Sequence, residues 1–507
     1  MRKVFSSIIL GIVCATFSFA QPVLTPKNLA LGGGGSTYIT DYNANFYNPA
    51  NLLINDRKKN LDIGFLVGVS SFNGVLNFEN PTTQKDNYLK YFNKFTIGDY
   101  AISQADRNLI IDTHYKRERL SSVHQSRFDV TTFGLNWTKN DRAFSFATRT
   151  RVGSRFEVGR NWYTNQKVIS ENNTTSNQDL IHNYQVLHEF SIGYSESVNL
   201  INGLSSRLDN FLIGIAPKFI LAGPYQKSEW RNTYNQTSGE ADINRTQSFE
   251  YLSAGNFSQA VLAYQDGTTS EQATEQSLEP FQDELTNIHG FGIGLDVGFT
   301  YLLTFGSDLS TLSSNRQQTK RSLRISLSIN DIGFVNYNDQ TLKLEQTTEN
   351  STSSNFPSTA NEAFVGAPGQ FLNFVDQYGD GNPFTDNSAA FTQSSFSTLL
   401  PASFNGGVLI ELSRIKLMGD MSIGISNSAF NTTRLTTSLG TEIRPLTFLP
   451  LRGGLQFTPG LPGSFNFGTA IETKYWDLSL AMMVSSRSFT SATNISGAGF
   501  AVLQFHL

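Results

Sequence analysis

The sequence predicts an all-β protein, a transmembrane β-barrel of about fourteen antiparallel strands with an N-terminal plug segment inside it. Three observations support this fold class: apolar and polar residues alternate with period two from Leu61 onward, charges fall on the less apolar face, and short and long connections alternate. A barrel in the outer membrane combines these properties because its outer face meets lipid, its lumen is hydrated and its periplasmic turns are short.

The composition excludes several other classes of protein. Charged residues make up 16% of the 507 residues, against about 25% in a typical soluble domain. The formal charge of −4 gives no basic surface for a nucleic-acid partner. No stretch after the first residues reaches the ~20 apolar residues of a membrane helix. We therefore expect outer-membrane lipid to surround the protein.

Residues 1–20 have the pattern of a signal peptide. Two basic residues precede the apolar run Ile8–Phe17, and small residues end it, so cleavage before Gln21 is predicted. The only cysteine, Cys14, lies in this segment, and the mature chain would then have no disulfide. The predicted location is the outer membrane of a Gram-negative cell.

The remaining chain divides into a plug segment at 21–60, which contains no clean strand, and a barrel at 61–507. A charge facing lipid at the membrane midplane costs roughly 2–4 kcal/mol, so the charged face of each strand is assigned to the lumen. The predicted strands are 61–70, 128–138, 143–155, 186–194, 211–221, 291–299, 323–329, 404–412, 415–425, 435–443, 449–457, 465–473, 476–484 and 499–507.

Long extracellular loops are predicted at about 80–126, 160–184, 223–289 and 335–400, each separated from the next by a shorter connection. A soluble β-sandwich also alternates in polarity, but it has no reason to place long loops at every second connection. The last strand ends at the C-terminus, which resembles the terminal strand of outer-membrane barrels. The loop pattern therefore favours the barrel over the soluble alternative.

The segment before the first strand contains the run Leu29-Ala30-Leu31-Gly32-Gly33-Gly34-Gly35-Ser36 and the motif Asn48-Pro49-Ala50. It resembles the plug of the FadL-like fatty-acid transporter superfamily, which includes the PorV proteins of Bacteroidetes. The segments Ser438–Glu442, Leu451–Gly454 and Phe467-Gly468 resemble an uncharacterised Bacteroidetes family, DUF5723. The resemblance implies a fourteen-stranded barrel with a plug, and it implies no particular ligand.

The motif Asn48-Pro49-Ala50 is predicted to form a rigid turn inside the lumen, because Pro fixes φ and Asn can hydrogen-bond nearby backbone. Direct contact with a ligand is the alternative. The glycines at 32–35 lack the Lys-Ser/Thr of a phosphate loop and are expected to be flexible chain entering the barrel.

Arg149, Arg151 and Arg155 lie on one lumenal line of a predicted strand. They would form an anion-binding patch or, alternatively, would balance charge with the plug or with lumenal acids. The candidate acids are Asp62, Glu411, Glu442 and Glu472.

Pro217 interrupts a predicted strand and cannot donate to a ladder, so a strand bulge or a local gap is expected there. In the fatty-acid transporters a strand kink opens a lateral exit, which is the functional alternative. Residues 376–382 favour a Gly/Asn turn, with a loop calcium site as the alternative.

The sequence supports no enzyme, cofactor or metal site, because its six histidines are scattered without ligand spacing. The first functional hypothesis is passive uptake or export of a hydrophobic or amphipathic compound. The second is a non-transporting accessory or scaffold barrel of an outer-membrane secretion or assembly machine, with an outer-membrane protein as partner. A hydrolase is a third alternative that no motif supports.

Overall fold

The computed structural model describes residues 25–54, 60–73, 101–115, 119–164, 167–170, 172–198, 209–277, 286–304, 321–367, 369–378, 381–459, 463–486 and 494–507. The predicted signal peptide lies outside these residues, as does much of the loop predicted at 80–126. None of the described helices is long and apolar enough to cross a membrane.

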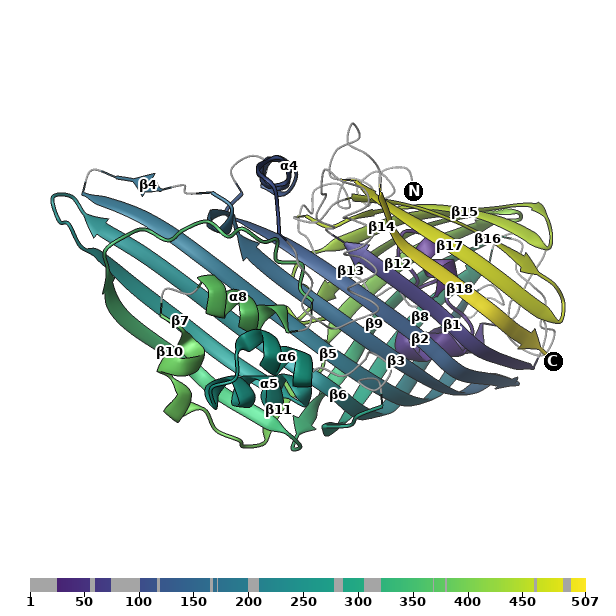
Figure 1. The fold of residues 1–507 in the computed structure, drawn as a ribbon. Coiled ribbons are helices and arrows are strands. Elements are labelled where there is room, and N and C mark those ends of the chain that lie inside the picture. The colour runs from purple at the N-terminus through teal and green to yellow at the C-terminus, as the bar shows by residue number, and fades with distance from the viewer. Residues whose placement is uncertain are drawn as a thin grey trace.

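The described strands form a closed antiparallel barrel (Figure 1). Of eighteen strands, all except β4, β7, β10 and β11 belong to the ring, which leaves fourteen. The ring closes between the first and the last strand, where Ile63 lies opposite Phe505. In ring order the strands are β1 Leu61–Asn73, β2 Ser121–Lys139, β3 Arg142–Gly159, β5 Asn173–Val198, β6 Asp209–Thr237, β8 Gly290–Thr304, β9 Arg321–Tyr337, β12 Ser403–Leu412, β13 Ile415–Gly424, β14 Thr436–Leu446, β15 Leu449–Phe457, β16 Gly463–Glu472, β17 Trp476–Ser486 and β18 Asn494–His506. The predicted all-β barrel of about fourteen antiparallel strands is confirmed.

The two faces of the barrel wall differ as the alternation predicts. On β6, Ile213, Ile215 and Phe219 point outward and are 45%, 48% and 49% exposed, whereas Ala216 and Lys218 between them are buried. Most of the other ring strands carry exposed Phe, Ile or Leu at alternate positions as well. This outward apolar surface is what a membrane-spanning barrel presents to lipid.

The wall of the barrel is much taller on one side than on the other. Strand β6 has 29 residues and β15 has 9, which correspond to about 95 Å and about 30 Å at the usual rise per residue. The tall wall projects to the left in Figure 1 and is widened by β7 Ile243–Ala254 and β10 Thr341–Ser353. Two short strands, β4 Val168–Ile169 and β11 Phe396–Leu399, pair with β5 and β9.

Much of the chain predicted as loops at 160–184, 223–289 and 335–400 is therefore regular structure. The prediction was wrong there because it used the alternation of an apolar outer face, which lipid imposes only within the membrane. The short turns lie at the opposite end of the barrel from this projecting sheet, as in outer-membrane barrels with short periplasmic turns. We call the projecting end the extracellular end, and this orientation stays a prediction.

Helices cover the outer face of the projecting sheet (Figure 1). They are α5 Asn256–Gln265, α6 Ser270–Ser277, α8 Gln370–Tyr378 and α9 Pro383–Asp386, and together with residues 356–367 we call them the helical cap. The cap buries an aromatic core in which Trp162 packs on Trp230 and Phe374, with ring centroids 5.3 and 5.0 Å apart. The remaining short elements are α2 Pro26–Ala30, η1 Tyr42–Phe46, η2 Pro49–Leu53, α4 Gln104–His114, η4 Arg160–Trp162 and η5 Ser388–Ala390.

Asp376, the first residue of the alternative calcium loop, is already engaged inside the cap. Its carboxylate accepts hydrogen bonds from Ser270 Oγ at 2.7 Å and from the Tyr264 hydroxyl. Burial and this carboxylate raise the pKa of Tyr264 above its ordinary value. Among the described residues, no three His, Cys, Asp or Glu side chains lie close enough together to hold a metal ion.

Candidate functional site

Residues 25–54, which we call the inner segment, lie within the ring of strands. Helix α2 contacts β1 and β15 to β18, whereas η1 and η2 contact β2, β3, β5, β6 and β8. Contacts with strands on opposite sides of the ring place the segment in the lumen, where its short helices are seen behind the front strands in Figure 1. Nearly all of its side chains are buried.

The Asn48-Pro49-Ala50 turn hydrogen-bonds to two strands of the barrel wall. Asn48 caps η2, because its Oδ1 accepts from the Ala50 N–H at 3.2 Å. Its Nδ2 donates to Thr300 Oγ1 on β8 at 3.0 Å. Ser195 on β5 donates to the Ala50 carbonyl at 2.9 Å. The turn thus contacts two separate strands, while its role as the anchor of a plug stays a prediction.

Glycines on the inward face of the wall receive the inner segment. A Cβ added to Gly64 or Gly134 would overlap with the ring of Tyr42, and one added to Gly298 would overlap with Asn48. Backbone of the inner segment stands where a Gly454 side chain would be. The sequence signal for this fit is Gly at alternate strand positions, as at Gly292, Gly294 and Gly298, but sequence reasoning missed it.

The glycine run of the inner segment is packed tightly against the wall. Gly32 and Gly33 have φ values of 84° and 83°, a conformation that side chains disfavour. The Gly35 and Ser36 N–H groups donate to Asp420 Oδ1 on β13 at 3.2 and 2.9 Å. The expectation of loosely held, flexible chain was therefore wrong, because these residues are buried and hydrogen-bonded to the wall.

A layer of paired charges lies directly on the inner segment. Arg149 contacts Glu189 at 2.5 Å, and its guanidinium carbon lies 4.2 Å from the centre of the Phe46 ring. Arg151 contacts Glu189 at 3.1 Å and Asp331 at 3.0 Å. We call this the charged layer: Asp129, Arg149, Arg151, Glu189, Lys218, Asp296 and Asp331.

The three arginines singled out in the sequence do not share one site. Arg149 and Arg151 belong to the charged layer, whereas Arg155 contacts Glu157 at 3.3 Å. Their acidic partners differ from the four acids proposed from the sequence, because strand register could not be derived there. The ion pairs favour charge balance, and the anion-binding patch stays a prediction.

An apolar layer follows the charged layer toward the extracellular end. It consists of four fully buried side chains that point inward from β5, β6 and β9: Leu187, Ile220, Val335 and Tyr337. They pack with residues from two connecting segments, Phe396, Leu400, Ala429 and Phe430. Sequence reasoning missed this layer because isolated apolar residues on a charged face leave the overall alternation unchanged.

Pro217 lies opposite Leu295 on β8 and interrupts the ladder between β5 and β6. Pairing resumes on either side in the same register, with Ser191 opposite Lys218 and Tyr194 opposite Ile215. The structure therefore has the local gap at Pro217, and the register shift of β6 lies farther along, between Ala222 and Tyr225. A lateral exit at this position stays a prediction.

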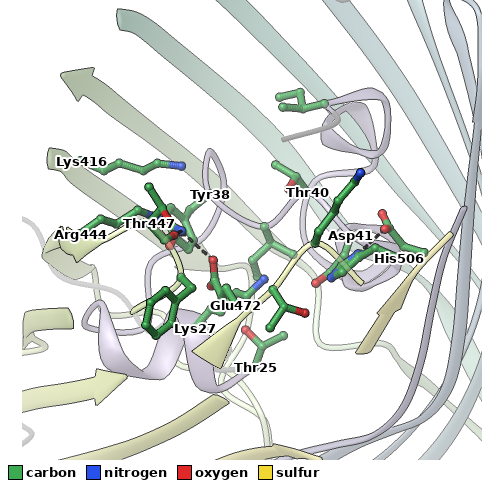
Figure 2. A pocket seen from close by; sticks show the side chains of 16 residues that line it. Thr25, Lys27, Tyr38, Thr40, Asp41, Lys416, Arg444, Thr447, Glu472 and His506 are labelled. Atoms are coloured by element: carbon green, nitrogen blue, oxygen red, sulfur yellow. Dashed lines mark hydrogen bonds and ion pairs between the residues drawn. The ribbon is translucent and has the colours of Figure 1, made fainter. Parts of the chain in front are cut away.

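A polar pocket of about 550 Å³ opens at the end of the barrel that carries the short turns (Figure 2). Its acids have partners: Glu472 contacts Arg444 at 2.7 Å, and Asp41 accepts from Gln504 at 2.7 Å. The lining comes from the inner segment and the strand ends: Thr25, Lys27, Tyr38, Thr40, Asp41, Lys416, Arg444, Thr447, Glu472 and His506.

Solved structures that resemble this one include transporters and channels. The toluene transporter TbuX of Ralstonia pickettii is 10% identical, with 96% of this chain and 98% of that chain covered and a TM-score of 0.41. The toluene transporter TodX of Pseudomonas putida is 10% identical, with 97% and 99% covered and a TM-score of 0.40. The monoaromatic hydrocarbon channel CymD is 12% identical, with 96% and 98% covered and a TM-score of 0.42.

The sequence itself matches one family model, over residues 58–484, which span most of the barrel. No curated protein matches the chain. The match confirms the resemblance seen in the C-terminal strands, and the chain belongs to DUF5723, a family of unknown function.

Proposed function

We propose that the protein is a passive outer-membrane channel for a hydrophobic or amphipathic compound, with the inner segment as its plug. The compound would enter at the extracellular end, pass the apolar and charged layers, and leave through the polar pocket. The resemblance of the inner segment to the FadL-like plug agrees with this proposal. In a passive channel of this kind, the compound would move down its concentration gradient.

The apolar layer is the observation that carries the proposal. A wide pore for hydrophilic solutes has a polar, hydrated interior. Here Leu187, Ile220, Val335 and Tyr337 face inward at one level of the lumen. Transfer from water to such a surface lowers the free energy of an apolar solute, whereas the same transfer is unfavourable for an ion or a sugar.

Uptake into liposomes tests the proposal. The probe is a fluorescent alkyl sulfonate, whose permanent charge slows its passage through protein-free bilayers. The full-length protein should accelerate its entry. Ile220→Thr, in the apolar layer, should slow entry severalfold, whereas Ile215→Thr on the outward face of the same strand should not. No acceleration by the intact protein would contradict the proposal.

The accessory-barrel alternative is supported by the size of the projecting sheet and the helical cap, which exceed what a simple pore needs. A protein with that role would pass no probe in the same assay. The hydrolase alternative has less support. Ser154 Oγ lies 3.1 Å from His182 Nε2, but both residues are buried and the imidazole packs against Phe364.

A further inference from the structure

The connection between β13 and β14, residues 425–435, crosses the lumen at the extracellular end. Its two ends are exposed or half-buried, while Ala429, Phe430, Asn431 and Thr432 at its tip are buried. A connection that lay on the surface would have the opposite pattern, with its tip exposed. We call residues 425–435 the strap.

The tip of the strap contacts the opposite wall. Gln125 Nε2 on β2 donates to the Ala429 carbonyl at 3.1 Å. The Arg151 guanidinium carbon on β3 lies 4.3 Å from the centre of the Phe430 ring. Five strands separate β13 from β3 in one direction around the ring, and six separate β14 from β3 in the other.

The strap is folded as a compact unit with few bonds to the wall. Ser428 Oγ accepts from the N–H groups of Phe430 at 3.2 Å and Asn431 at 3.0 Å, which forms a tight turn. Thr433 N–H donates to Asn427 Oδ1 at 3.0 Å and links the two ends. Beyond the strap, Asn431 Nδ2 donates to the carbonyls of Pro401 and Ala402. At its ends, the Ile425 N–H donates to the Ala402 carbonyl at 2.9 Å and Arg434 Nη1 donates to the Pro459 carbonyl at 3.3 Å, so these bonds join the strap to other connections. Such a unit can leave the lumen without breaking strand pairing.

We propose that the strap is an extracellular gate and that Phe430 is its closing residue; this rests on the proposed passage of a solute through the lumen. Phe430 lies within the apolar layer and above Arg151 of the charged layer. Outward movement of the strap exposes Phe430 to water, which is unfavourable when the lumen is empty. The same movement exposes the apolar layer, and an apolar solute that takes the place of the ring covers this layer again, which lowers the cost and shifts the population toward the open state. The gate therefore opens preferentially to apolar solutes.

A cysteine pair tests whether the strap must move. A Cβ at Gly153 would lie 2.7 Å from a ring carbon of Phe430, so Gly153→Cys with Phe430→Cys brings two thiols within the range of a disulfide. The oxidised full-length protein should take up the alkyl sulfonate probe roughly tenfold more slowly than the reduced protein, because the open state is lost. Each single variant should not respond to oxidation. Equal uptake by the oxidised and reduced pair would overturn the gate.

Thiol labelling tests the motion independently of transport. Phe430→Cys should react with a membrane-impermeant maleimide roughly tenfold faster than Leu180→Cys, which is equally buried under the helical cap, because strap opening is a local event. Addition of the probe should accelerate only the reaction at position 430. Equal rates would show that the strap is fixed and would overturn the proposal. If the intact protein takes up no probe, the proposed function fails, and the labelling rates still decide whether the strap opens.

Discussion

The backbone of Pro49 occupies the space that a side chain on Gly214 would need. Gly214 lies on the inward face of β6, between two lipid-facing isoleucines, and Pro49 lies in the turn of the inner segment. The wall and the segment inside it thus depend on each other at atomic distance, although 165 positions separate the two residues in the sequence.

A methyl group at this contact should displace the inner segment. Gly214→Ala adds a Cβ that overlaps with backbone atoms of Pro49 and Ala50, which cannot rotate away. We expect a loss of about 1–3 kcal/mol in the free energy of unfolding, as for other overpacked sites, and a higher conductance in planar bilayers. Gly453→Ala on β15 is the control, because its Cβ would meet no atom within 4 Å. Equal behaviour of the two variants would contradict the packing described here.

The stability cost of an arginine on the outward face should show which positions contact lipid and which contact water. Leu327 on β9 is 60% exposed within the apolar surface, and Leu120, just before β2 at the extracellular end, is 79% exposed. Leu327→Arg should cost about 2–4 kcal/mol and Leu120→Arg about 0–1 kcal/mol, because the cost falls with distance from the midplane. Unfolding by denaturant in lipid vesicles measures both. Equal costs would mean that the outward face at Leu327 is not embedded in lipid.

Two lysines on β6 should differ in their contribution to stability. The Lys218 side chain is fully buried and contacts Asp296 at 2.9 Å, whereas that of Lys227 is 29% exposed and contacts Glu250 at 2.7 Å. Lys218→Met leaves the buried carboxylate of Asp296 without its cation and should cost about 3–5 kcal/mol. Lys227→Met should cost about 0–1 kcal/mol. If unfolding experiments gave both variants the stability of the parent protein, the charged layer would not be held together by its ion pairs.

The mature protein should fractionate with the outer membrane. A closed barrel resists unfolding by detergent at room temperature, so it should migrate differently on a gel before and after heating. Recovery of the protein from the soluble periplasm, without heat-dependent migration, would refute the membrane assignment.

The membrane part of the fold could be predicted from the sequence because lipid enforces the alternation. Phe144 and Arg149 on β3, for example, face lipid and lumen as the pattern indicates. The extracellular half of β5 could not be predicted. There the outward side chains, such as His182 and Tyr184, pack under the helical cap or against it instead of facing lipid.

The candidate site could be predicted only in part from the sequence. The Asn48-Pro49-Ala50 turn was recognised because its chemistry is local. The ion pairs of Arg149 and Arg151 depend on which strands are neighbours, and Glu189 could not be identified as their partner without register. The position of Phe430 could not be predicted at all, because it depends on a connection that reaches across the lumen to β3.

Single-channel recording tests the central claim most directly, namely that the inner segment fills the lumen of a transmembrane barrel. Deletion of residues 28–50 removes the last three residues of α2, all of η1 and the Asn48-Pro49-Ala50 turn, but no ring strand, so the variant should keep its heat-dependent migration. The conductance of its open events in planar bilayers should be well above that of the intact protein, because a fourteen-stranded barrel is wide enough to leave an aqueous path once the inner segment is absent and the strap has opened. A folded deletion variant with the conductance of the intact protein would contradict the account.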